Sequence, residues 1–163
     1  MGYMSEEKIF KFLRDLKDHL IKYEDKHGGE MGSVDYSDAR VRYGSKIAYF
    51  ESMVFICDDI VDAFEPADLR LEEFYDDPYT DIYISCEGEI YEWVYGYESR
   101  GGDERKKDFH DAFRDAAENN GLTMEFCGGA LAFQSEESWD RQNADENAER
   151  EKMEEEFKRL KEE

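Results

Sequence analysis

Apolar residues recur at helical spacing near the start of the chain. Six apolar side chains recur at helical spacing, each three or four positions from another, as on one face of an α-helix: Ile9, Phe12, Leu13, Leu16, Leu20 and Tyr23. Ser5 precedes them and is a favourable N-cap, and Gly28-Gly29 follows as a stop signal. The pattern predicts a helix over residues 5–26.

The most apolar stretch of the chain comes next. Residues 38–43 alternate between apolar and basic positions, which predicts a short strand. Residues 45–64 are apolar around much of a helical circumference, and Pro66 follows them. We therefore expect a central apolar helix over residues 45–64. Its single polar stripe is acidic and consists of Glu51, Asp58, Asp62 and Glu65.

Two later stretches alternate around short turns and predict β-hairpins. Residues 80–95 would form the first, with the turn at Glu87-Gly88 and with Ile82 and Ile84 on the core face. Residues 122–134 would form the second, in which Phe126 faces Leu131 and Met124 faces Phe133. Between the hairpins, an apolar stripe at helical spacing predicts a helix over residues 103–119, with Asn120-Gly121 as its stop.

These elements predict an α+β fold with an antiparallel sheet of four to five strands, including the two hairpins, packed by helices. We expect residues 1–135 to form a single domain and residues 136–163 to form a charged C-terminal helix. Met153, Phe157 and Leu160 give that helix a short apolar stripe. The stripe would either dock on the domain, which we expect, or pair with a second copy of the chain.

Composition changes this picture through charge. The chain of 163 residues has 43 acidic and 21 basic side chains, a formal net charge of −22. Residues 1–50 are neutral overall, whereas residues 51–99 hold 15 acids and a single base, Arg70. Because about two-thirds of the net charge lies in this middle segment, it would attract a basic surface and repel nucleic acid and anionic membrane.

The middle segment supplies the candidate partner-binding residues. Its carboxylates fall about 6–7 Å apart on a helix or on alternate strand positions, a spacing close to that of successive phosphates, and its tyrosines could add apolar anchors. The candidates are Glu51, Asp58, Asp62, Glu65, Asp68, Glu72, Glu73, Asp76, Asp77, Asp81, Glu87, Glu89 and Glu92, with Tyr75, Tyr79 and Tyr83.

Patterns that would indicate an enzyme are weak. Asp58-Asp59-Ile60-Val61-Asp62 has the spacing of a Mg²⁺-binding helix, but no second acidic motif and no basic residues for a diphosphate accompany it. The three cysteines show no C-x-x-C spacing, which argues against zinc and against a disulfide framework. We expect no catalytic residue, no metal and no cofactor. The first residues are too polar for a secretory signal, so we expect a cytoplasmic protein.

In size, charge and aromatic content the chain resembles the small anti-restriction and anti-CRISPR proteins of phages and mobile elements. The resemblance lies in composition alone and transfers no residue. It implies a non-enzymatic inhibitor whose acidic surface mimics nucleic acid in the basic groove of a nucleic-acid-binding enzyme. Two alternatives stay open: an immunity protein that neutralises a basic nuclease toxin, and a metal-dependent enzyme that uses Asp58 and Asp62.

Overall fold

The computed structural model describes residues 4–31, 36, 39–50, 60–66, 78–86, 89–95, 104–127 and 129–162, and the structural statements below concern these residues. The helices are α1 (Glu6–Met31), α2 (Ile60–Ala63), α3 (Glu89–Tyr95), α4 (Glu104–Asn119) and α5 (Glu136–Glu162). The strands are β1 (Arg40–Tyr43), β2 (Lys46–Tyr49), β3 (Glu65–Pro66), β4 (Ile82–Ser85), β5 (Leu122–Cys127) and β6 (Ala130–Ser135).

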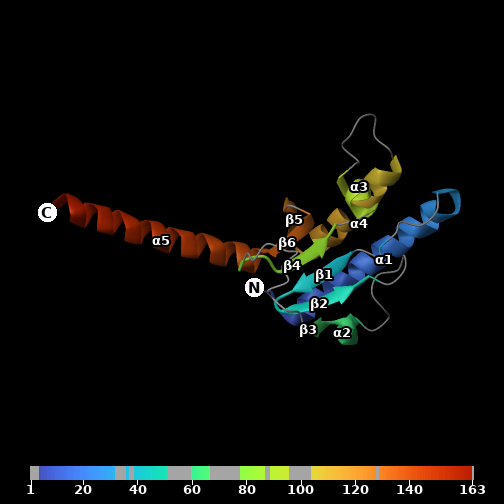
Figure 1. Cartoon of the computed structure of the whole chain (residues 1–163), viewed down its shortest axis with the longest axis horizontal. Helices are drawn as coiled ribbons and strands as arrows, with labels where there is room; N and C mark the ends of the chain where they lie inside the picture. The colour runs from blue at the N-terminus through green and yellow to red at the C-terminus, as the bar shows by residue number, and fades with distance from the viewer. Residues whose placement is uncertain are drawn as a thin grey trace.

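The described strands form one antiparallel sheet in the order β3-β2-β1-β4-β6-β5 (Figure 1). The predicted α+β class is therefore confirmed, although the sheet has six strands where four or five were expected. Strand β4 lies near the middle and pairs with β1 on one side and with β6 on the other. This placement buries the side chains of β4 on both faces of the sheet.

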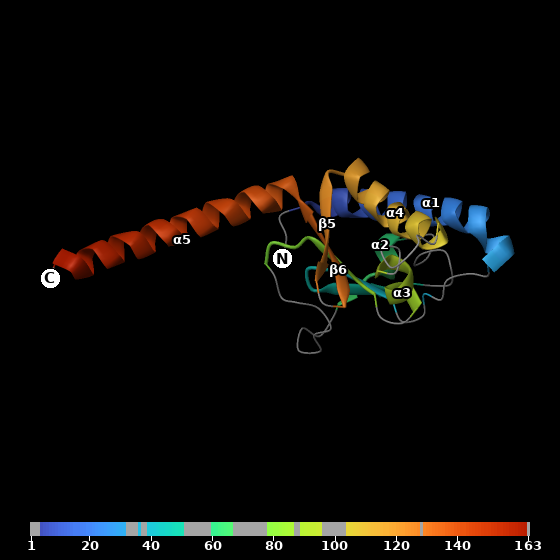
Figure 2. The ribbon, with the colours of Figure 1, turned by 90° about the horizontal axis from the view of Figure 1, so that it is seen from above.

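Helices α1 and α4 lie side by side on one face of the sheet (Figure 2). The core forms between this helical layer and the strands. Phe12 of α1 contacts Phe133 of β6 with ring centroids 4.9 Å apart, and Phe10 of α1 contacts Tyr43 of β1 at 5.8 Å. Aromatic rings thus supply much of the buried apolar surface, which is the main favourable term in folding.

The sequence predicted α1 and α4 well. All six apolar positions of the first predicted stripe are buried in α1, and the predicted stripe of α4 is buried as well. The backbone N–H of Lys8 donates to Ser5 Oγ at 3.4 Å, as expected for an N-cap. The end of the first helix was wrong, because α1 continues through Gly28 to Met31. Helix α4 does end at the predicted stop, where Gly121 has a positive φ of 68°.

The predicted second hairpin is also confirmed. Strands β5 and β6 pair in the expected register, with Phe126 opposite Leu131 and Met124 opposite Phe133. Leu131 and Phe133 are fully buried, whereas the side chain of Phe126 is 42% exposed and lies against the ring of His110. The expected apolar face of this hairpin therefore reaches the core through β6 more than through β5.

The predicted first hairpin is wrong. Residues 82–85 form β4 as expected, but the second half of the predicted hairpin is helix α3. Both edges of β4 are already occupied by β1 and β6, so no edge remains for a strand formed by residues 89–95. Ile90 and Val94, four positions apart, are both fully buried, which is the spacing of one helical face.

The predicted central helix over residues 45–64 is wrong as well. Lys46–Tyr49 forms strand β2, which pairs with β1 across a tight turn where Gly44 has a positive φ of 55°. The only helical part within the described residues of this range is the short α2, and residues 51–59 lie outside the described residues. A stretch that is apolar on all sides lacks the one-sided periodicity that separates a helix from a buried strand.

Helix α5 follows β6 without a loop and projects away from the domain (Figure 1). The side chains of Met153, Phe157 and Leu160 are 65%, 62% and 64% exposed. The expected docking of this stripe on the domain is therefore not found. None of the described helices is long and apolar enough to cross a membrane.

Candidate interaction surfaces

The predicted acidic array divides into exposed and buried members. Asp62 in α2, Glu65 in β3 and Glu92 in α3 are exposed. Asp81 and Tyr83 are buried, with 2% and 6% exposure, so predicting them as contact residues was wrong. Tyr79 is half-buried.

The remaining candidates lie outside the described residues, as does the side chain of Glu89: Glu51, Asp58, Asp68, Glu72, Glu73, Tyr75, Asp76, Asp77 and Glu87.

Asp81 is a structural residue. Its Oδ1 accepts hydrogen bonds from the backbone N–H of Met4 at 2.9 Å and from Ser138 Oγ at 2.8 Å. Its Oδ2 accepts one from the backbone N–H of Ser135 at 2.7 Å. These three donors give the buried carboxylate the hydrogen bonds that water would give it at the surface. Asp81 therefore joins the start of α1 to the point where β6 becomes α5.

The same residues cap α5. Ser135 precedes the helix, and its Oγ accepts a hydrogen bond from the backbone N–H of Ser138 at 3.2 Å, the geometry of an N-cap. Ser135 Oγ in turn donates to Ser138 Oγ at 3.1 Å. Glu136 and Glu137 occupy the first turn, where the helix dipole favours negative charge. The sequence predicted this helix over residues 136–163, but the cap was not identified.

Further contacts fix the first three turns of α5. Lys8 Nζ of α1 lies 2.6 Å from Glu137 Oε1, and the Tyr79 hydroxyl donates to Asp145 Oδ2 at 2.7 Å. The hydrogen bond from Lys8 lowers the pKa of Glu137 and raises that of Lys8. These contacts hold the root of α5, which we define as residues 135–145, against β6, α1 and the segment that precedes β4.

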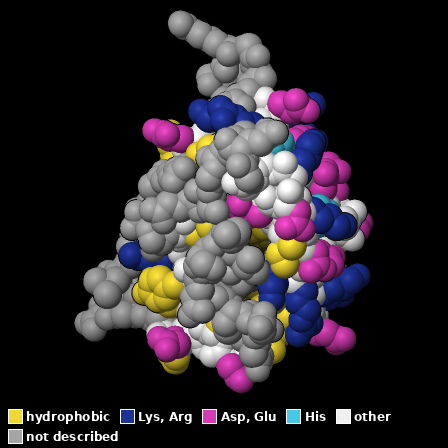
Figure 3. Space-filling view, turned by 90° about the vertical axis from the view of Figure 1, so that its right-hand side faces the viewer, with side chains coloured by type: hydrophobic (Ala, Val, Ile, Leu, Met, Phe, Trp, Pro, Cys, Tyr) yellow, Lys and Arg dark blue, Asp and Glu magenta, His cyan; other side chains and the backbone are white. Residues whose placement is uncertain are grey.

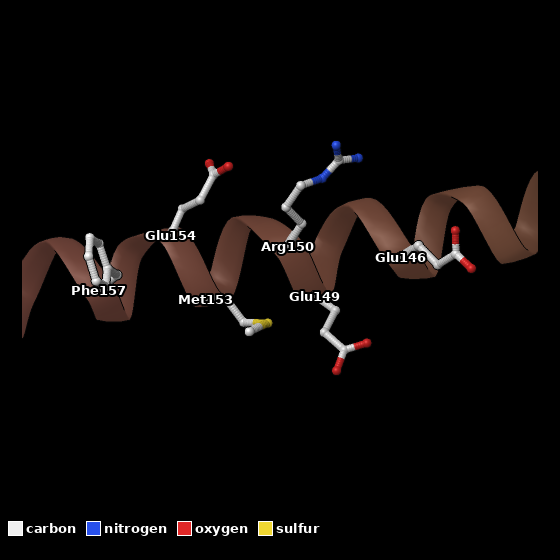
Figure 4. A pocket seen from close by; sticks show the side chains of 6 residues that line it. All are labelled: Glu146, Glu149, Arg150, Met153, Glu154 and Phe157. Atoms are coloured by element: carbon white, nitrogen blue, oxygen red, sulfur yellow. The ribbon is translucent and has the colours of Figure 1, made fainter.

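Beyond the root, the side chains of α5 are exposed from Glu146 to Glu162. Met153 and Phe157 lie one turn apart and, with Glu146, Glu149, Arg150 and Glu154, line a shallow hollow along the helix (Figure 4). All six side chains come from this one helix. The hollow is thus an open helix face and not a cleft between elements.

The opposite end of the molecule carries mixed charge. On the face turned away from α5, Lys and Arg side chains lie among Asp and Glu side chains (Figure 3). The fields of neighbouring charges of opposite sign cancel at a distance. Salt also screens each exposed charge beyond a short range. The described residues of this face therefore do not present a partner with a surface of one charge sign.

A polar cluster joins α1 to α4. Asp108 Oδ2 accepts hydrogen bonds from Lys26 Nζ at 2.8 Å and from His27 Nε2 at 2.7 Å. Partial burial of the carboxyl would raise the pKa of Asp108, but the hydrogen bonds from Lys26 and His27 outweigh it and hold that pKa below its usual value. The cluster thus joins the C-terminal part of α1 to α4.

This cluster predicts a pH-dependent contribution to stability. A carboxyl whose pKa is lower in the folded than in the unfolded state stabilises the fold above its unfolded pKa of about 4, and the effect is lost as the pH falls through the folded pKa. We expect Asp108→Asn to lower the free energy of unfolding by about 1 kcal/mol at pH 7 and by almost nothing at pH 2.5. Urea unfolding of both proteins across this range measures the difference. A constant difference at every pH would contradict the assignment.

A buried thiol and possible metal ligands were the remaining chemical features within the part of the chain that the structure describes. Burial raises the pKa of the Cys86 thiol to about 12, so this thiol is not a nucleophile at neutral pH. No three His, Cys, Asp or Glu side chains of the described residues lie close enough together to hold a metal ion.

Comparison of the chain with protein-family models, with curated proteins and with solved structures gave no match. Interpretation of the site therefore depends on its own geometry and charge.

Proposed function

We propose that this protein is a non-enzymatic inhibitor that uses an acidic surface to occupy the basic groove of a nucleic-acid-binding enzyme. The observation that carries the proposal is the concentration of charge in residues 51–99, which hold 15 acids and one base. Three acidic residues of this segment, Asp62, Glu65 and Glu92, are exposed. Exposed carboxylates of this kind can meet lysine and arginine side chains of a partner.

The physics of nucleic-acid binding supports such competition. A protein binds phosphates largely by releasing their counterions through its lysine and arginine side chains. A fixed array of carboxylates can engage the same cations with charge-assisted hydrogen bonds. Helix α5 adds a second acidic element, with 11 acidic and six basic side chains between Glu136 and Glu162. Binding of this kind weakens as salt is added and excludes nucleic acid from the groove.

The proposal is tested by retaining partners on the immobilised full chain at low salt and identifying them by mass spectrometry. We expect a nucleic-acid-binding enzyme that duplex DNA or RNA displaces and that salt releases. The triple variant Asp62→Asn, Glu65→Gln, Glu92→Gln should lower its affinity roughly tenfold. The matched control Glu7→Gln, Asp18→Asn, Glu125→Gln removes three exposed charges elsewhere and should change the affinity less than about threefold.

Three outcomes would contradict the proposal. Equal effects of the two triple variants would show that net charge alone drives binding. A single nuclease that stays bound at high salt and resists displacement by nucleic acid would indicate an immunity protein instead. If no basic protein is retained even at low salt, the mimic is wrong, and Asp58→Asn with Asp62→Asn should then be assayed for loss of a metal-dependent activity.

A further inference from the structure

The exposed apolar residues of α5 follow a coiled-coil pattern. Met153, Phe157 and Leu160 are separated by four and then three positions, which is the spacing of the core positions of a heptad. Continued toward the root, the same spacing passes through Arg150, Glu146, Asn143 and Trp139. Trp139 is 52% exposed. One face of α5 thus carries an apolar residue at its start, three at its end and polar residues between them.

This face is complementary to itself when two copies run in opposite directions. If Glu146 of one copy lies opposite Arg150 of the other, the same register sets Trp139 opposite Phe157 and Asn143 opposite Met153. The two central pairs then join opposite charges, and each end brings two aromatic rings together. The overlap covers residues 136–160, a length of about 37 Å.

Other arrangements are less favourable. A parallel pair in register would place Glu146 against Glu146 and Arg150 against Arg150 at the centre of the interface, and like charges at such positions are unfavourable. Shifting the antiparallel pair by one heptad would set Glu146 against Phe157 and Arg150 against Met153, and would bury the charges on apolar side chains. Of these three arrangements, only the antiparallel pair with Glu146 opposite Arg150 joins opposite charges at its centre, and it has two-fold symmetry.

We propose that a second copy of this chain covers this face, and that the two α5 helices pair antiparallel with Glu146 opposite Arg150. The contacts at the root of α5 hold that end of the helix on the domain, and the face stays accessible beyond the root, where residues 146–162 are exposed. Self-association works against the net charge of −22 on each copy, so salt should strengthen it. Binding of a basic partner by the acidic surface should respond to salt in the opposite way, and the two proposals can therefore fail separately.

The test is sedimentation equilibrium of the full chain at 0.15 M and 1 M NaCl. We expect a monomer–dimer equilibrium with a dissociation constant on the order of 10–100 µM in 1 M salt, several-fold weaker in 0.15 M salt. Glu146→Arg and Arg150→Glu should each weaken the dimer by about tenfold, because symmetry places each changed contact at two positions. The double variant Glu146→Arg, Arg150→Glu restores opposite charges and should return the constant to within about threefold of the original.

Matched controls change the same charges on another face of α5. Glu151→Arg and Arg159→Glu should alter the dissociation constant less than about threefold. Circular dichroism checks that all the variants keep their helix content. An engineered cysteine in place of Glu149, beside the symmetry axis, should form an intermolecular disulfide faster than one in place of Ala148, which faces away.

Two results would overturn the proposal. A chain that stays monomeric up to 500 µM in 1 M salt has no such interface. A dimer whose single charge reversals have no effect, or whose double reversal is not restored, pairs through another register or another surface.

Discussion

Asp81→Ala is expected to lower the free energy of unfolding by about 3–4 kcal/mol. The substitution leaves three donors without their acceptor: the backbone N–H groups of Met4 and Ser135 and the hydroxyl of Ser138. Each buried donor without a partner costs about 1–3 kcal/mol, and part of the loss is recovered as water and neighbouring groups adjust. Thermal or urea unfolding followed by circular dichroism measures the change.

Two companion variants make this result specific. Asp81→Asn keeps the volume and one acceptor oxygen, but turns an amide toward one donor, so we expect a loss of about 2 kcal/mol. Glu92→Ala removes a carboxylate from the same acidic segment, where the side chain is exposed, and should change stability by less than about 0.5 kcal/mol. Equal effects at Asp81 and Glu92 would show that Asp81 is not a buried acceptor.

Phe109→Ala is expected to cost about 3–5 kcal/mol of unfolding free energy. The ring is fully buried and contacts four aromatic side chains, at centroid distances of 5.2–6.2 Å: Tyr23, Tyr36, Trp93 and Phe113. Removing it loses the transfer free energy of the ring and leaves a cavity that a packed aromatic cluster cannot fill. Chemical denaturation with a two-state fit gives the value.

Phe126→Ala is the control for this substitution. The side chain of Phe126 is 42% exposed on strand β5, so its removal should cost about 1 kcal/mol or less. Comparing Phe109→Ala with Phe126→Ala also tests whether residues 89–95 form helix α3, since Trp93 contacts Phe109 from that helix. Equal losses of unfolding free energy from the two substitutions would contradict this packing.

The elements that the sequence predicted share one property: each buries a single face. Helices α1 and α4 and the hairpin of β5 and β6 show an apolar period that reports burial directly. The two elements that were wrong depend on pairing elsewhere in the sheet. Residues 46–49 became a strand by pairing with β1, and residues 89–95 could not be a strand because β4 had no free edge. A local sequence pattern contains no information about which strands pair or which sheet edges are occupied.

The candidate site was predictable to a similar degree. Charge counting located the acidic segment and three of its exposed members, because surface charge needs no partner to be recognised. It could not separate Asp81 from them, since the donors to its carboxylate come from residues 54 to 77 positions away. One local signal was present: Ser135 followed by Glu136 and Glu137 is typical of a helix start. It would have identified Ser135 as the N-cap of α5.

The contacts of Asp81 also set the order in which the chain can fold. The carboxylate joins Met4, 77 positions before it, to Ser138, 57 positions after it. On the ribosome, α1 and β4 emerge well before β6, and β4 keeps one unpaired edge until β6 arrives. The sheet and the cap of the last helix therefore close together, only after residues up to Ser138 have been made. Contacts of such long range make folding slow, and they leave a ribosome-bound nascent chain dependent on protection of that open edge.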